Sequence, residues 1–260
     1  MFRWNPADCA DQSAAQLAWA LSLLQRLKPM GTESILDIGC GDGKVTAEIA
    51  AAVRGGFVIG VDSSAEMIAH AAARHRAPNL EFRCADARSL QFDRSFDIAF
   101  SNASLHWVDD WQAVFKNLAG CLRTGGRLIV SCGGKGNADE VLHAAERICA
   151  TAPWRQYFRE FNFAWHFHDD VSADRLLRQA GFVPDRVELV LKDMTHDGPA
   201  GLAGWFRTTW MPYTHQVPEE SREAFVATIV DGYLAGRPPD AEGRTHVAMV
   251  RLEIEATRRE

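Results

Sequence analysis

The chain has 260 residues, of which 47% are hydrophobic and 24% charged, proportions that are typical of a globular protein and exclude a disordered or collagen-like chain. This length favours a single α/β domain over residues 1–260, with at most a small appended cap. The net charge is −6 and there is no basic block, so a nucleic-acid partner is not expected, and no apolar run approaches the ~18 residues of a membrane span.

Short apolar runs alternate with helical patterns in the first half of the chain. Apolar runs bounded by glycine or polar residues predict five strands, over 35–38, 57–61, 80–84, 96–101 and 127–131. Apolar side chains that recur every three to four residues predict helices over 11–27, 45–53, 65–75, 114–122 and 137–151. Strands and helices that alternate at this spacing favour a parallel sheet covered on both faces.

Beyond residue 150 the pattern is less regular. A helix is predicted near 176–180, a sixth strand over 187–191 and a seventh over 245–255. The segment between the last two strands, 192–244, contains several aromatic residues and a predicted helix over 219–234. So long a connection inside a compact domain is usually functional, and we expect it to form a helical cap over a substrate pocket.

A glycine-rich turn joins the first strand to the helix that follows it. Its pattern is Asp37-x-Gly39-x-Gly41-x-Gly43. Glycines let the backbone pass close to a ligand, and the start of the helix offers unpaired N–H groups to it. A dinucleotide fingerprint would place its third glycine at position 44, where this chain has Lys44. The spacing therefore argues against a nicotinamide-dependent dehydrogenase, the alternative with a related fold.

The turn resembles motif I of the class I S-adenosylmethionine-dependent methyltransferases. The resemblance continues in chain order at the next three strand ends, with Asp62, Asp86 and Asn102 in the matching positions. It implies S-adenosylmethionine as the cofactor and the family's fold. That fold is a Rossmann-like doubly wound sheet of seven strands, the last antiparallel, with a helical cap inserted before it over residues 192–244.

The same resemblance implies a role for each matching residue. Asp37 would reach the ammonium of the cofactor directly or through water, and Asp62 would accept both ribose hydroxyls. Asp86 would bind the adenine amino group, and Asn102 would lie at the methionine end. The predicted cofactor-binding residues are Asp37, Gly39, Cys40, Gly41, Asp62, Ser63, Met67, Asp86, Ala87 and Asn102. Met67 fits a core position on its helix equally well.

Two groups of carboxyl methyltransferases are similar over most of the chain. Trp4-Asn5-Pro6 and the run from Asn102 to Leu105 are similar to trans-aconitate methyltransferases, and Leu105-His106-Trp107 looks like insect juvenile hormone acid methyltransferases. In the latter a glutamine on the N-terminal helix and the tryptophan of this run act at the substrate carboxylate, so the resemblance implies Gln16 and Trp107 in that role. Residues 1–30 would form an N-terminal helical lid.

The chemistry agrees with a small, partly apolar carboxylic acid as the acceptor. A carboxylate has an unperturbed pKa of about 4 and is already a nucleophile at neutral pH, so that no general base is required. An N–H group of Gln16 or Trp107 could orient one oxygen while the other attacks. The alternative within enzymes is N-, C- or phenol O-methylation of another small metabolite, with His106 as the base. A regulatory module that binds the cofactor without catalysis is the alternative outside enzymes.

The remaining candidates point to no metal and no macromolecular partner. The run His166-x-His168-Asp169-Asp170 resembles a metal cluster but lacks a third ligand at a familiar spacing, so a polar turn that caps the next helix is favoured. The six cysteines form no C-x-x-C pair, and the N-terminus lacks the apolar region of a secretory signal. We therefore expect reduced thiols, a cytoplasmic location, and no membrane or obligate protein partner.

Overall fold

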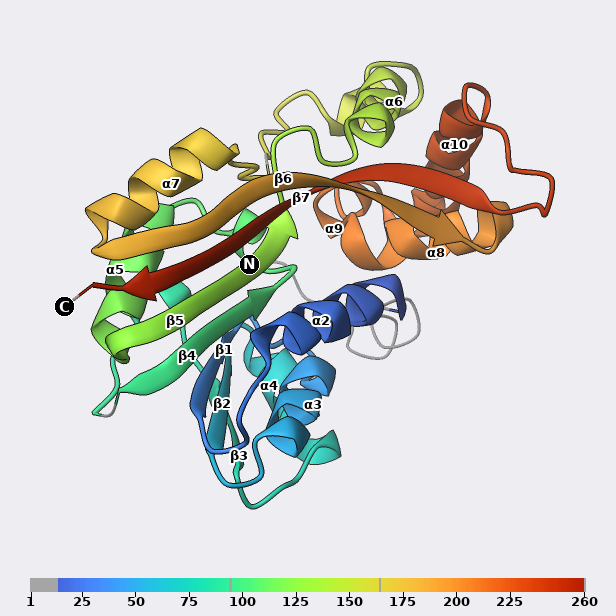
Figure 1. Ribbon diagram of the computed structural model, residues 1–260. Coiled ribbons are helices and arrows are strands. Elements are labelled where there is room, and N and C mark those ends of the chain that lie inside the picture. Colours follow the sequence, from blue (N-terminus) through green and yellow to red (C-terminus); the bar gives the residue numbers. More distant parts are fainter. Residues whose placement is uncertain (1–13, 94, 164, 260) are drawn as a thin grey trace. The chain divides into compact units, whose positions relative to one another are not determined.

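The computed structural model describes residues 14–93, 95–163 and 165–259, with side chains from Trp19 onward (Figure 1). The chain divides into two compact units. The first, here called the sheet unit, comprises 16–135, 165–190 and 251–260, and the second, the helical unit, comprises 1–15, 136–164 and 191–250. Two of the boundaries between the units fall within the long strands β6 (Phe182–His196) and β7 (Thr245–Arg258).

The strands form a seven-stranded sheet in the order β3-β2-β1-β4-β5-β7-β6. The first five are parallel, and β7 runs antiparallel to β5, which confirms the Rossmann-like sheet with an antiparallel last strand. All seven predicted strands are present, and the last three are longer than predicted. The bounds of the first five are β1 Ser34–Ile38, β2 Phe57–Asp62, β3 Leu80–Cys84, β4 Phe96–Asn102 and β5 Leu122–Gly133.

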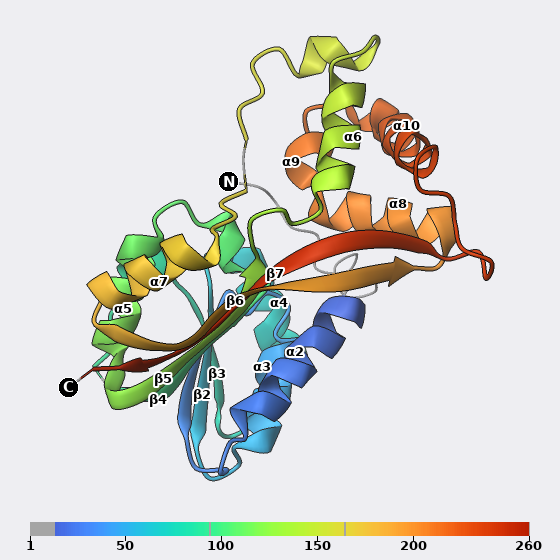
Figure 2. The ribbon, with the colours of Figure 1, turned by 45° about the horizontal axis from the view of Figure 1, so that its top comes forward.

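Helices cover both faces of the sheet in the sheet unit (Figure 2). One face carries α2 (Ala14–Leu27), α3 (Lys44–Ala52) and α4 (Ala65–Arg74), and the other carries α5 (Trp111–Cys121) and α7 (Asp170–Gln179). Each face has its own buried apolar cluster, which explains why the central strands read as continuous apolar runs. Two short 3₁₀ turns, η1 (Ala87–Ser89) and η2 (Leu105–Trp107), follow β3 and β4.

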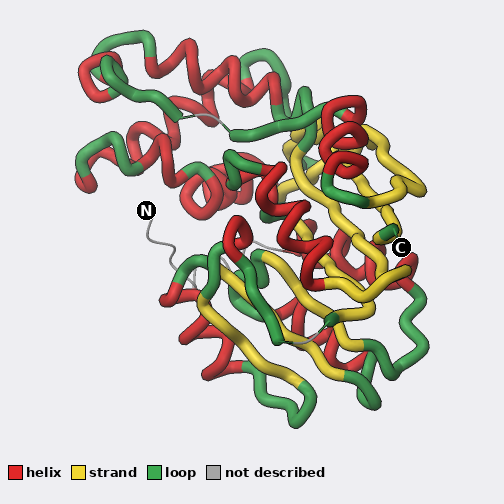
Figure 3. Tube along the Cα trace, turned by 90° about the vertical axis from the view of Figure 1, so that its left-hand side faces the viewer, coloured by secondary structure: helices red, strands yellow, loops and turns green. Residues whose placement is uncertain are grey.

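The described part of the helical unit contains four helices and two short turns, together with the adjoining ends of β6 and β7 (Figure 3). The helices are α6 (Asp139–Cys149), α8 (Gly198–Thr209), α9 (Met211–Thr214) and α10 (Arg222–Leu234), and the turns are η3 (Trp154–Tyr157) and η4 (Glu219–Ser221). Its core is aromatic, with Trp154 and Phe158 both packed on Phe225 at ring-centroid distances of 5.1 and 5.3 Å. Residues 136–164 belong to this unit in addition to the segment predicted as a cap.

Helix starts follow the predicted chemistry. Ser64 caps α4 by accepting a hydrogen bond from the backbone N–H of Met67. Asp169 caps α7 in the same way, accepting from the N–H of Ser172 at 2.8 Å. The polar turn at 166–170 is therefore a helix cap, as favoured from the sequence, and no cluster that could hold a metal ion is found among the described residues.

No helix in the described ranges is long and apolar enough to cross a membrane. The cysteines that the structure describes, Cys40, Cys84, Cys121, Cys132 and Cys149, are free thiols.

The cap of α7 yields a first prediction. Asp169→Ala removes the side-chain acceptor of the Ser172 N–H, so the free energy of unfolding should fall by about 0.5–2 kcal/mol, whereas Asp169→Ser should restore most of the loss. Urea unfolding of both variants measures the difference. If the turn is only a cap, a chelator such as EDTA leaves the midpoint of the wild type unchanged. A midpoint that drops with EDTA and recovers with zinc would show a metal site instead.

Candidate active site

The predicted cofactor residues gather at one edge of the sheet unit. Parallel strands have their carboxyl ends on the same edge, and ligands of open α/β sheets bind there. Three of the predicted residues stand at that edge: Gly39 directly follows β1, Asp62 ends β2 and Asn102 ends β4. Residues far apart in the sequence are thus brought together by the register of the sheet, in which Asn102 pairs with Ser131 of β5.

Asp37 is a buried carboxyl group near the end of β1. It is 2% exposed, and its Oδ2 accepts a hydrogen bond from the hydroxyl of Thr46 on α3 at 2.7 Å. Burial raises the pKa of Asp37 to about 7, the Thr46 hydrogen bond opposes the rise, and the nearby charge of Asp62 adds to it. Asp37 has no ion-pair partner among the described residues, so none of their cations balances its negative charge.

Asp62 ties the glycine turn to the start of α4. Its Oδ2 accepts from the N–H of Gly41 at 3.0 Å, and its Oδ1 accepts from the N–H of Ser64 at 2.9 Å. Burial raises the pKa of this carboxyl, and the backbone hydrogen bonds oppose the rise. Each carboxylate oxygen can accept a second donor, so the side chain can hold the turn and still accept the two hydroxyls of a diol.

The glycines of the turn differ in what surrounds them. Gly39 has φ +71°, and a Cβ on it would lie 1.7 Å from Oγ of Ser104, so this glycine is required by the protein's own packing. Gly41 has φ +54°, and the nearest atom to its absent Cβ is Cε of Met67 at 3.8 Å. The backbone at Gly41 therefore has room beside it for a ligand, in agreement with its predicted place at the cofactor.

The other predicted cofactor residues at this edge differ in their exposure to solvent. Cys40 and Met67 are buried, whereas Ser63 is exposed. Asp86 caps η1 and forms an ion pair with Arg88 at 2.7 Å, which holds the pKa of the Asp86 carboxyl below its usual value. Its side chain remains 39% exposed, so the carboxylate can still accept an amino group while paired. Ala87 is the first residue of η1 and is partly buried.

The segment after β4 brings His106 into the core of the sheet unit. His106 is buried, and its Nδ1 accepts a hydrogen bond from the backbone N–H of Gly133 at 3.2 Å. A neutral imidazole has one acceptor nitrogen and one N–H, so this bond places the proton on Nε2. Burial, together with the positive charge of Arg251, lowers the pKa of His106 to about 3. The side chain is therefore neutral at physiological pH.

Of the two residues predicted at the acceptor carboxylate, the structure describes the side chain of one. Trp107 is partly buried in η2, and its ring packs edge-on against Trp165 with a centroid distance of 5.8 Å. Gln16 lies within α2, but its side chain is outside the described residues. The acceptor roles of both residues remain predictions.

Sequence reasoning missed one charged residue at this edge. Arg251 of β7 is 3% exposed, and its Nη2 donates to the carbonyl oxygen of Ser131 at 2.6 Å and approaches Oδ1 of Asn102 at 3.5 Å. The available signal was an arginine in line with Val247 and Met249, at the inward positions of a strand whose alternating residues are apolar.

The sheet topology, the glycine turn and the acidic end of β2 define a class I methyltransferase. Residues 35–126 match the family model of the methyltransferase domain. The trans-aconitate 2-methyltransferase of Methylobacterium radiotolerans is 30% identical over 269 residues, which cover 98% of each chain. The chain therefore belongs to the S-adenosylmethionine-dependent methyltransferases, and S-adenosylmethionine is its cofactor.

Solved structures show the same fold at low sequence identity. A Bacillus halodurans C-125 protein described as a methyltransferase has a TM-score of 0.64 at 16% identity, covering 94% of this chain and 100% of that one. Phosphoethanolamine N-methyltransferase 2 of Haemonchus contortus, in complex with S-adenosyl-L-methionine, has a TM-score of 0.57 at 19% identity, covering 94% of this chain and 53% of that one. The buried carboxyls of Asp37 and Asp62, without a cationic partner in the described chain, fit a cofactor that carries positive charge.

The buried carboxyl of Asp37 generates a second prediction. Its pKa is about 7 in the folded chain, against about 4 in an unfolded one, so between these values the folded state binds the extra proton. The free energy of unfolding contributed by this group therefore falls as pH rises through this window. Asp37→Asn carries no charge and should gain stability over wild type progressively from about pH 4 to 7, by on the order of 3–4 kcal/mol, with no further gain above about pH 8.

Urea unfolding of both proteins across this pH range measures the effect. As a second variant, Thr46→Val removes the hydrogen bond that lowers the pKa of Asp37, so its loss of stability should extend to higher pH. An equal stability difference between wild type and Asp37→Asn at every pH would contradict the assignment.

Proposed function

We propose that this methyltransferase transfers the methyl group of S-adenosylmethionine to a carboxylate oxygen of a small, partly apolar organic acid. The observation that carries the proposal is the state of His106. A general base works best when its pKa lies near the operating pH, whereas burial lowers the pKa of His106 to about 3. Its Nδ1 is also occupied by the N–H of Gly133. An ionised carboxylate is the acceptor that needs no such base.

The thiol of Cys132, the residue before Gly133, cannot replace His106 as the base. Burial raises the pKa of the Cys132 thiol to about 12, so this side chain is neutral too. Catalysis then depends on holding donor and acceptor in line and excluding water, not on removing a proton. The name of the Methylobacterium relative, trans-aconitate 2-methyltransferase, supports a carboxylate acceptor as well. A phenol or amine acceptor with His106 as base is the second candidate.

In this proposal, different residues at the carboxyl edge of the sheet bind different parts of the cofactor. Asp37 binds the ammonium group, Asp62 the ribose diol and Asp86 the adenine amino group. The backbone at Gly39, Cys40 and Gly41 lies along the cofactor, whose sulfonium supplies the methyl group. Ser63, Met67 and Ala87 surround the adenine, and Asn102 lies at the methionine end.

The acceptor side of the proposal involves Gln16 and Trp107. Each offers an N–H that can orient one carboxylate oxygen while the other attacks. The proposal also includes an N-terminal lid over residues 1–30, of which 1–13 lie outside the described residues, and an acceptor cap over residues 192–244 of the helical unit. The free cysteines in the described part of the chain support a reducing location such as the cytoplasm.

Cofactor binding through Asp62 can be measured with the demethylated product S-adenosylhomocysteine. The product should raise the melting temperature of the wild type by mass action, and NADH should not. Asp62→Asn should weaken product binding roughly 10- to 150-fold in calorimetry, because one acceptor of the ribose diol is replaced by a donor. Asp174→Asn, on the exposed part of α7, is the matched control and should bind as wild type. Stabilisation by NADH alone would contradict the proposal.

The pH dependence of turnover separates the two candidate acceptors. With a carboxylate acceptor and saturating cofactor, the rate should stay nearly flat from about pH 6 to 9, since the acid is ionised throughout. His106→Asn keeps an acceptor for the Gly133 N–H and should retain most activity, whereas Gln16→Ala should lose roughly 5- to 150-fold in kcat/KM.

The same pH profiles and variants also test the second candidate, a phenol or amine acceptor with His106 as the base. A rate that climbs with pH, together with a ~10²–10⁴-fold loss in His106→Asn, is the behaviour of general-base catalysis and would reject the carboxylate acceptor.

A further inference from the structure

Arg251 stands at the edge of the sheet where the acceptor is expected. In the antiparallel pairing of β7 with β5, Arg251 is opposite Gly133, the last residue of β5. Its guanidinium reaches Ser131 and approaches Asn102, the last residue of β4, which pairs with Ser131 in the sheet. The side chain therefore lies at the carboxyl ends of β4 and β5, which are two and three strands away from β2 in the sheet.

The positive charge of Arg251 is buried, and no carboxylate among the described residues forms an ion pair with it, although the charge of Glu253 favours the charged form and opposes the lowering of the Arg251 pKa by burial. Its hydrogen-bond partners in the described chain are neutral oxygens: the carbonyl and hydroxyl of Ser131 and the side-chain amide of Asn102. The ring of Trp19, 5.4 Å from the guanidinium carbon, compensates part of the lost hydration. Burial of a cation without a counter-ion is unfavourable, and a neutral donor would serve Ser131 and Asn102 equally well.

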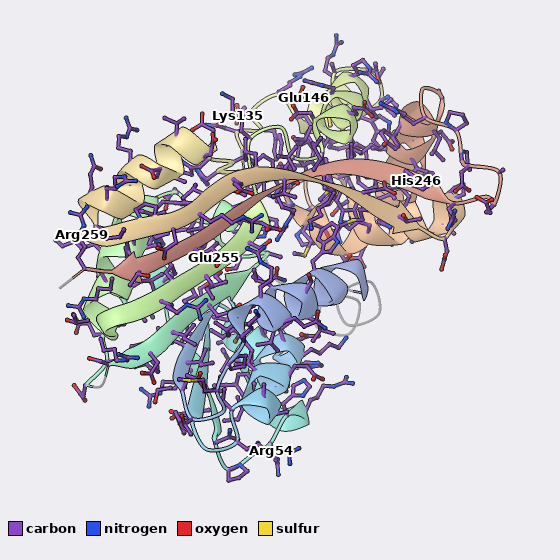
Figure 4. All side chains as sticks on the ribbon, viewed as in Figure 1. Arg54, Lys135, Glu146, His246, Glu255 and Arg259 are labelled. Atoms are coloured by element: carbon purple, nitrogen blue, oxygen red, sulfur yellow. The ribbon has the colours of Figure 1, made fainter. Side chains whose placement is uncertain are left out.

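The nearest acidic side chain on the same strand is already engaged. Glu253 forms ion pairs with Arg26 of α2 at 2.6 Å and with Arg186 of β6 at 2.8 Å. Glu255, labelled in Figure 4, also pairs with Arg26. Two arginines thus balance these two glutamates, and Arg251 remains the buried cation of this part of the strand.

The hydrogen bonds of Arg251 leave one arm of the guanidinium for a ligand. They use Nε and Nη2, whereas Nη1 takes part in none of them. Because Ser131 already holds the side chain in place, little conformational entropy is lost when a carboxylate binds to Nη1. A contact through Nη1 alone leaves the other carboxylate oxygen available.

We propose that Arg251 binds a carboxylate group of the acceptor and so selects anionic substrates. The inference rests on the proposed function and names its substrate-binding cation. The carboxylate of the cofactor has the same chemistry, and Asn102, which the proposed function places at the methionine end, lies 3.5 Å from Arg251. Binding of S-adenosylhomocysteine to the Arg251 variants therefore separates the two sources of a carboxylate.

The test compares the binding of an acid with the binding of its primary amide, which has the same shape but no charge. For an acid that the enzyme methylates, Arg251→Met should raise KM roughly 10- to 150-fold and remove the preference for the acid over the amide. Arg251→Lys, which keeps the charge, should retain part of that preference. The affinity for S-adenosylhomocysteine should change less than about threefold in both variants.

Controls make each outcome decisive. Arg186→Met removes another arginine that lies against β7 and should leave KM unchanged. An equal rise in KM in this control would overturn the inference, as would a loss of S-adenosylhomocysteine affinity without a rise in KM, which would assign Arg251 to the cofactor. If Arg251→Met fails to fold, the acid-to-amide ratio of Arg251→Lys decides, and a ratio equal to wild type refutes the proposal.

If the proposed function is wrong, the results differ from those that would refute the role of Arg251. In that case no methyl ester forms with any acid, whatever residue occupies position 251. Calorimetric binding of acid and amide in the presence of S-adenosylhomocysteine still measures whether Arg251 recognises a carboxylate.

Discussion

Unbalanced buried charge at the carboxyl edge of the sheet is the constraint on which the rest of the site depends. Asp37 is held between β1 and α3, where the Thr46 hydroxyl is its one hydrogen-bonding partner among the described residues. In the described part of the chain, Asp62 accepts hydrogen bonds from backbone N–H groups, and Arg251 donates to neutral oxygens. Each charge costs stability in the free protein and becomes favourable once a partner of opposite sign arrives. A positively charged cofactor and an anionic acceptor supply such partners.

The backbone around this edge keeps the charged groups apart. Both Gly39 and Cys40 donate to the carbonyl of Val61, which holds the glycine turn against the end of β2. On the other side, the N–H of Ala103 donates to the carbonyl of Ser131, the same oxygen that receives the guanidinium of Arg251. The acidic groups therefore lie at β1 and β2 and the basic group at β5 and β7, so that the edge has a negative and a positive end. A cofactor that donates a methyl group to a carboxylate fits this polarity.

Much of the sheet unit could be predicted because local and long-range signals agree there. The apolar runs mark buried strands, and the motif residues fall at strand ends where parallel pairing brings them together. In the helical unit the signals conflict. Leu202, Trp205 and Phe206 have the spacing of a buried helix face in α8, but Gly198-Pro199 and Pro212 beside them indicate a loop. Residues 136–164 join this unit by packing of α6 on α10, a contact that no periodicity encodes.

The charge states of the site residues also could not be predicted from the sequence, because they depend on tertiary structure. His106 follows a strand in the sequence, where it fits a general base, but burial and the Gly133 N–H make it neutral with its proton on Nε2. Arg251 is an exception to an apolar pattern, and only the pairing with β5 reveals what it faces.

The most direct measurement of the central claim is mass spectrometry of the products formed from S-adenosylmethionine and matched panels of acids, phenols and amines. The expected product is a methyl ester that mild alkali converts back to the acid, with one S-adenosylhomocysteine per ester. Methylated phenols or amines without any ester would contradict it.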